Sequence, residues 1–183
     1  NVIKEPKEKE AMSEMYQAQE YFDQALTAPT ASDSLYNLAL NGGNSKYGFL
    51  DIIENYGGTK AANLSNYYAG VAYLNTNDYK NAISYLDTFS SDDAMLGPIA
   101  KGAIADAFVQ LNQLDKALEY YQIAASLQDN EFTTPRFLLK AGIIALETGN
   151  TAKAVTHFTT ITQMYSKATE AVKAKAYLSK AKA

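Results

Sequence analysis

The chain has 183 residues, of which 47% are hydrophobic and 20% are charged, and its formal net charge is −4. This composition is typical of a folded protein and excludes a wholly disordered chain, and the negative charge gives no basis for a nucleic-acid partner. The chain has no cysteine, which excludes disulfides, a thiolate nucleophile and cysteine-based metal sites.

The first sixty residues predict two helices separated by a loop. Apolar residues at helical spacing indicate a helix from about Lys7 to Ala28. The apolar stripe of this helix would consist of Met12, Met15, Tyr16, Phe22 and Leu26. The stretch "APTASDSLYNLALNGGNSKY" is rich in turn residues and predicts an inserted loop over about 29–45, either a functional loop or a plain surface excursion. A second helix is expected over 46–56.

Three similar stretches follow: "LNTNDYKNAISYL" at 74–86, "VQLNQLDKALEYY" at 109–121 and "LETGNTAKAVTHF" at 146–158. Their alanines, Ala82, Ala117 and Ala154, are separated by 35 and 37 residues. Around each alanine, a small residue precedes a turn residue that accepts a left-handed backbone, and a large residue follows. These are Gly70, Asn77 and Leu86, then Ala105, Asn112 and Tyr121, then Gly142, Gly149 and Phe158. The pattern predicts a helix-turn-helix repeat in which small residues make room for large ones.

The repeats predict six helices, over 61–75, 78–88, 97–111, 115–127, 135–147 and 151–164. Thr134 before Pro135 predicts a helix start, and Asp78 and Asp115 suit the starts of second helices. A last helix over 167–182 would cover the end of the stack. Residues 166–183 hold five lysines and one glutamate, a local net charge of +4, which is either a solvated face or a surface for an acidic partner or lipid.

This spacing and residue order resemble the tetratricopeptide repeat. The resemblance implies an all-α superhelix of about four helix pairs plus a C-terminal capping helix, in a single domain over 1–183. Its parts would be a degenerate first repeat over 1–60, repeats over 61–96, 97–133 and 134–166, and a capping helix over 167–183. The chain departs from the family at the start of the first helices, where Asn66, Lys101 and Leu138 replace the large residue expected.

In that family the first helix of each pair lines a concave groove that binds protein segments. The residues at groove positions are Leu64, Tyr67, Val71, Leu74 and Asn75, then Ile99, Gly102, Asp106, Val109 and Gln110, then Arg136, Leu139, Ile143, Leu146 and Glu147. The predicted partner-binding residues are Tyr67, Val71, Leu74, Asp106, Gln110, Arg136, Leu139 and Ile143. The pair Tyr67 and Tyr68 could form a ligand cage, but core packing is the favoured interpretation. The groove is either open to a partner or the closed inner surface of a short superhelix.

No motif in the sequence predicts catalysis, a cofactor or a metal site. The single histidine, His157, lies beside Phe158 in a second helix and is expected to point outward. "NGGNSKYG" and "YGGTK" lack the order of a phosphate-binding loop. The protein is therefore predicted not to be an enzyme, a small hydrolase acting through His157 being the alternative.

The string "GFLDIIENYGGTKAANLSNYYAGVAYLNTNDYKNAISYL", with "AKGAIADAFVQLNQLDKALEYY" and "LLKAGIIALETGN", resembles the bacterial YfgM-type proteins in their Bacteroidetes form. The resemblance implies a domain on the periplasmic side of the inner membrane, with one anchor upstream of "IKEPKEKEAMSEMYQAQEYF". It also implies the Sec translocon or periplasmic chaperones as partners. An outer-membrane assembly subunit of the lipoprotein type and a structural homo-oligomer are alternatives.

Overall fold

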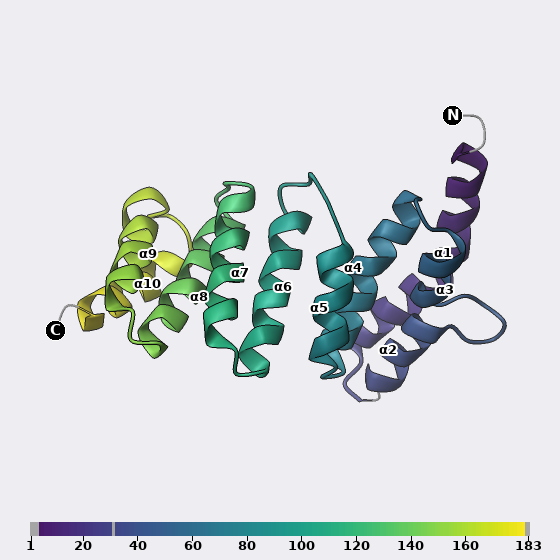
Figure 1. Ribbon diagram of the computed structural model, residues 1–183, viewed down its shortest axis with the longest axis horizontal. Coiled ribbons are helices and arrows are strands. Elements are labelled where there is room, and N and C mark those ends of the chain that lie inside the picture. Colours follow the sequence, from purple (N-terminus) through teal and green to yellow (C-terminus); the bar gives the residue numbers. More distant parts are fainter. Residues whose placement is uncertain (1–3, 31, 182–183) are drawn as a thin grey trace. The chain divides into compact units, whose positions relative to one another are not determined.

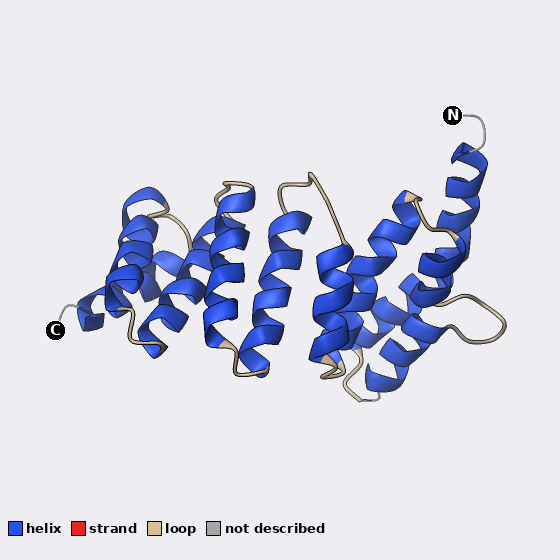
Figure 2. Cartoon of the chain, viewed as in Figure 1, coloured by secondary structure: helices blue, strands red, loops and turns tan. Residues whose placement is uncertain are grey.

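The chain folds into α-helices throughout the part that its structure, a computed structural model, describes, residues 4–30 and 32–181. Ten helices follow one another in these residues (Figure 1), joined by loops, with no strand among them (Figure 2). None of these helices combines the length and the apolar character needed to cross a bilayer. The helices form two compact units, unit 1 (Asn1–Ser90) and unit 2 (Ser91–Ala183). The predicted all-α repeat class is confirmed.

The six helices of the three repeats lie within two residues of their predicted bounds. Unit 1 contains α1 (Lys4–Thr27), α2 (Ser32–Asn41), α3 (Phe49–Asn55), α4 (Lys60–Asn75) and α5 (Tyr79–Thr88). Unit 2 contains α6 (Leu96–Gln110), α7 (Leu114–Leu127), α8 (Thr133–Glu147), α9 (Thr151–Met164) and α10 (Glu170–Ala181). Two parts of the predicted repeats lie outside the described residues: the start of the first repeat, 1–3, and the end of the capping helix, 182–183.

The segment predicted as an inserted loop contains a helix, α2. Its turn residues gather at the two ends, whereas the middle, "SLYNLAL", supplies the apolar residues that a helix needs. Tyr36, Ala39 and Leu40 are buried in the core of unit 1. Burial of this face outweighs the turn-forming composition around it.

Helix α1 packs through a different stripe from the one predicted. Met15 and Phe22 are buried as expected, but Met12, Tyr16 and Leu26 are exposed to 45%, 61% and 58%. The other buried positions, before, between and after Met15 and Phe22, are the alanines Ala11, Ala18 and Ala25. Small side chains let neighbouring helices approach α1 closely, so this face is buried and the face with Met12, Tyr16 and Leu26 is left outside.

Unit 1 has an aromatic core centred on Phe22. The Phe22 ring lies 5.5 Å from Tyr36 and 5.0 Å from Tyr68, between centroids, in edge-to-face geometry. Tyr68 also stacks on Phe49 at 5.0 Å. Tyr68 is therefore a packing residue, as favoured from the sequence, and the tyrosine pair does not form a cage.

The three predicted turn residues adopt the left-handed backbone. The φ angles are +64° at Asn77, +55° at Asn112 and +76° at Gly149. Beyond each one the chain closes back on the helix, as where the Asp78 amide donates to the Tyr73 carbonyl at 2.9 Å. This closure is the Schellman motif, and it directs the chain into the second helix of each repeat.

The predicted exchange of small for large residues is also present. A Cβ atom added to Gly70 would lie 2.4 Å from Leu86 Cγ, and one added to Gly142 would lie 2.4 Å from Phe158 Cε1. Leu86 and Phe158 are fully buried. Each glycine therefore gives the second helix of its repeat the space for a large side chain.

Two first helices begin earlier than predicted, α6 at Leu96 and α8 at Thr133. Asn130 Oδ1 accepts hydrogen bonds from the amides of Phe132 and Thr133, at 2.9 and 2.8 Å. One repeat earlier, Asp93 Oδ1 holds the start of α6 in the same way. Thr134 therefore lies inside α8, because a side chain upstream satisfies the free amides.

Candidate functional site

Three of the predicted partner-binding residues, Tyr67, Val71 and Leu74, lie on α4 in unit 1, and all three are half-buried. The Tyr67 ring packs 5.3 Å from the ring of Phe89 and 5.7 Å from that of Tyr68. Burial, and then the neighbouring Tyr68, raise the pKa of the Tyr67 hydroxyl above its ordinary value. The hydroxyl is therefore neutral at physiological pH, and these side chains offer an apolar, uncharged surface.

In unit 2, Asp106 on α6 is held by two neighbours. Lys140 Nζ lies 2.6 Å from Asp106 Oδ1, and the Tyr121 hydroxyl donates a hydrogen bond to the same oxygen. The Lys140 amino group also lies over the Tyr121 ring, 5.4 Å from its centroid. Burial, and then the bond to Asp106, raise the pKa of the Tyr121 hydroxyl far above its ordinary value. Asp106 thus links α6, α7 and α8, with 37% of its side chain still exposed.

The other predicted residues of unit 2 differ in exposure. Gln110 and Arg136 are exposed and Ile143 is half-buried, whereas Leu139 is only 8% exposed. Arg136 lies over the ring of Phe137, with its guanidinium carbon 5.7 Å from the centroid. Leu139 therefore belongs to the floor of any binding surface here, and Arg136 and Ile143 belong to its rim and walls.

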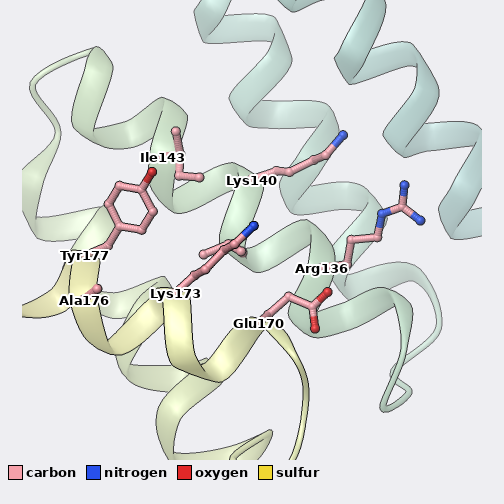
Figure 3. Close-up of a pocket in the computed structure, with 8 residues that line it drawn as sticks. Arg136, Lys140, Ile143, Glu170, Lys173, Ala176 and Tyr177 are labelled. Carbon is pink, nitrogen blue, oxygen red and sulfur yellow. The ribbon is translucent and has the colours of Figure 1, made fainter.

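Arg136, Leu139 and Ile143 come together in a hollow of about 440 Å³ between α8 and α10. Lys140 of α8 and Glu170, Lys173, Ala176 and Tyr177 of α10 complete the lining. Figure 3 shows α10 lying beside α8, with Lys173 extending toward α8 and Tyr177 beside Ile143. The hollow has an apolar floor and a charged rim.

Two further hollows adjoin this one along the same two helices. One, of about 430 Å³, shares Arg136 and Glu170 and ends at the exposed ring of Phe132. The other, of about 540 Å³, shares Ile143 and Tyr177 and continues past the last turn of α8. We call the three together the α8–α10 seam, defined by Glu131, Phe132, Arg136, Leu139, Lys140, Ile143, Leu146, Glu147, Lys167, Glu170, Lys173, Ala176, Tyr177 and Lys180.

The contribution of α10 to this surface was not predicted, because the last helix was expected to act as a cap. A signal for it exists in the sequence. Glu170, Lys173, Tyr177 and Lys180 recur at spacings of three and four residues, which places them on one helix face. A face of this composition at the end of a repeat array is suited to continue a groove.

His157 does not point outward as predicted. Its Nε2 lies 3.0 Å from the amide nitrogen of Gln122 on α7, and the side chain is half-buried. Burial, and then the charge of Lys153, lower the pKa of the imidazole below its ordinary value. The Gln122 amide donates a hydrogen bond to the neutral ring. His157 therefore faces α7 and packs against it.

No set of three or more histidines, aspartates or glutamates that could bind a metal ion occurs among residues 4–30 and 32–181. The polar atoms of the α8–α10 seam are side-chain amines, a guanidinium, carboxylates and a phenol. They can form ion pairs and hydrogen bonds with another polypeptide.

The tetratricopeptide repeat family matches the chain twice, at residues 67–132 and 103–169. The two matches together span residues 67–169, more than half of the 183 residues. No curated protein matches the chain, so the narrower resemblance to YfgM-type proteins stays a prediction. Tetratricopeptide repeats are a non-enzymatic fold that mediates interactions between proteins. The chain belongs to the tetratricopeptide repeat family.

Proposed function

We propose that this protein is a non-enzymatic scaffold that binds segments of other proteins along the first helices of its repeats. The observation that carries the proposal is the α8–α10 seam, in which three adjoining hollows follow the length of one first helix. The buried Leu139 and half-buried Ile143 and Tyr177 supply apolar contact area. Charged side chains at the rim supply orientation.

Helix α4, the first helix of the repeat in unit 1, supports the same proposal with an uncharged surface. Tyr67, Val71 and Leu74 offer aromatic and aliphatic surface on α4 without any charge. A partner could place apolar side chains there. The proposal assigns partner contact to these residues and, in unit 2, to the exposed Gln110, to Arg136 and to Ile143, with Asp106 positioning Lys140 behind them.

Contacts of His157 support the non-enzymatic assignment over a small hydrolase. A general base needs a nucleophile within hydrogen-bond reach and an acid that orients the ring. The hydrogen-bond partner of His157 Nε2 is the Gln122 amide, which is neither a nucleophile nor an acid. A hydrolase would show turnover that disappears in the His157→Ala variant.

We further propose a setting on the periplasmic side of the bacterial inner membrane, with the Sec translocon or periplasmic chaperones as partners. The resemblance to YfgM-type proteins supports this setting. Protection of the native protein from external protease in intact cells, and its digestion in spheroplasts, would agree with it. A lipidated cysteine on the native protein would favour an outer-membrane assembly subunit instead, and a stable dimer that fills the seam would favour a structural homo-oligomer.

Selection of peptides from a random library on the intact protein tests the scaffold proposal. We expect selected peptides to lose binding to the Ile143→Arg variant, because a bulky cation would fill the wall between two hollows. The control is Glu119→Arg, an exposed position on α7. Peptides that bind both variants as well as the wild type would show that binding occurs elsewhere and would contradict the proposal.

A further inference from the structure

The α8–α10 seam contains more cations than anions. Its lining includes the cations Arg136, Lys140, Lys167, Lys173 and Lys180 and the anions Glu131, Glu147 and Glu170. The central hollow alone has three cations and one anion. This excess contrasts with the whole chain, whose net charge is −4.

Two of the central cations are available to a ligand. Lys140 is paired with Asp106 at 2.6 Å, so its charge is already matched. Arg136 and Lys173 are both exposed, and they come from the two facing helices (Figure 3). A carboxylate lying over the hollow would therefore meet cations from both sides.

Apolar side chains form the floor between these cations. Leu139, Ile143, Ala176 and Tyr177 line the same hollow of about 440 Å³. Tyr177 is fixed in place by stacking on Phe158, with the ring centroids 5.4 Å apart. A held aromatic ring beside an aliphatic wall is suited to take up one apolar side chain of a ligand.

The interspersed glutamates argue against a polyanion as the ligand. Glu131, Glu147 and Glu170 lie among the cations along the seam. A continuous row of phosphates, as on a lipid surface or nucleic acid, would meet repulsion at each of these positions. Separate carboxylates spaced by apolar residues fit this pattern, because they can lie against the cations alone.

We propose that the α8–α10 seam binds an acidic peptide segment of a partner protein. Side-chain carboxylates pair with Arg136 and Lys173, and an apolar side chain between them enters the hollow beside Ile143 and Tyr177. This inference rests on the proposed scaffold function and adds the chemistry of the partner to it.

Fluorescence anisotropy with the full chain and three short labelled peptides tests the inference. The probe peptide consists of Glu-Glu-Leu repeats with an amidated C-terminus, so that only side-chain carboxylates are present. The comparison peptides replace every Glu with Lys, or every Leu with Ser. We expect the probe to bind more tightly than either comparison peptide, and its affinity to fall as NaCl is raised from ~50 to ~300 mM.

Two variants of α10 form a matched pair for this assay. Lys173→Glu reverses a charge in the hollow, whereas Lys175→Glu makes the same change at an exposed residue two positions along the helix that lines none of the three hollows. We expect Lys173→Glu to weaken the affinity for the probe peptide by about tenfold or more, and Lys175→Glu to leave this affinity nearly unchanged. Matching urea midpoints would show that both variants are folded.

Three results of these binding assays would overturn the inference. Equal loss of probe affinity in both variants would show that only net charge matters. Equal binding of the Lys-containing peptide would show an apolar groove without charge preference, and binding of phosphatidylglycerol vesicles in place of peptides would show a lipid surface. If the Ile143-dependent library peptides are neutral or basic, the acidic partner is wrong and the scaffold function stands. If no peptide depends on Ile143, both fail.

Discussion

Lys140 Nζ lies 2.6 Å from Asp106 Oδ1, which joins the first helices of two successive repeats through residues 34 positions apart. The buried Tyr121 hydroxyl donates to the same carboxylate oxygen from the second helix between them. The carboxylate therefore serves two partners that differ in burial. Because Tyr121 is buried and Lys140 is partly exposed, losing the bond to Tyr121 should lower the free energy of unfolding more than losing the bond to Lys140.

Asp106→Ala is expected to lower the free energy of unfolding by ~1 to 3 kcal/mol, because it leaves the Tyr121 hydroxyl buried without its acceptor. Lys140→Met should cost only about 0 to 1 kcal/mol, because the ion pair is partly exposed and screened by water. Urea denaturation measures both. The control is Tyr121→Phe: in that background Asp106→Ala should cost less, and an unchanged cost would contradict the role of the hydroxyl.

Gly142→Ala is expected to lower the free energy of unfolding by about 0 to 2 kcal/mol. The new methyl group would lie 2.4 Å from Phe158 Cε1, and overpacking of this kind costs ~1 to 3 kcal/mol, less about 1 kcal/mol for the better helix propensity of alanine. Denaturant unfolding of a double-mutant cycle with Phe158→Leu measures the contact. The second change should cost less after the first, and strict additivity would show that the two residues do not interact.

Unfolding free energy should fall as the pH is lowered below about 6.5, the ordinary pKa of histidine, in part through His157. Its folded-state pKa is lowered by burial and by Lys153, so the unfolded chain binds the proton more tightly. Stability from the neutral ring is therefore present above the unfolded pKa and is lost below it. Urea midpoints at several pH values measure this, and His157→Gln should flatten the slope in that range. An unchanged slope would show that other groups cause it.

Glu8→Ala should destabilise unit 1 by about 1 kcal/mol, the usual cost of losing a helix cap. The Glu8 carboxylate accepts hydrogen bonds from the amides of Lys60 at 2.7 Å and Ala61 at 3.0 Å, both at the start of α4. Hydrogen exchange at these two amides should speed up in the variant. The control is Glu5→Ala, at an exposed position in α1, the helix that contains Glu8. Equal exchange rates of the two amides in both variants would count against the cap.

Much of the repeat architecture was predictable because it depends on local rules. Left-handed turns favour Asn or Gly, so Asn77, Asn112 and Gly149 revealed the chain reversal inside each of the three repeats. Close helix pairs need a small residue opposite a large one, so Gly142 and Phe158 revealed the packing of a repeat. Both rules act within one repeat and can be read without knowing the rest of the fold.

The features that were missed depend on contacts distant in sequence or on residues outside the expected positions. Helix α2 forms because Tyr36 and Leu40 reach a core whose other members come from α1, α3 and α4. The buried face of α1 carries alanines beside Met15 and Phe22, where Met12, Tyr16 and Leu26 were also expected. His157 faces Gln122, 35 residues away. The spacing of Lys173 and Tyr177 places them on one face of α10, but it does not specify that this face packs beside α8.

Photo-crosslinking in cells tests whether the first helices of the repeats bind other proteins. A photo-reactive residue is placed at Tyr67 or Ile143 on first helices, and at the exposed Ser84 or Glu119 on second helices as controls. We expect crosslinks to other proteins from Tyr67 and Ile143, and few or none from Ser84 and Glu119. Crosslinks confined to Ser84 and Glu119 would contradict this expectation.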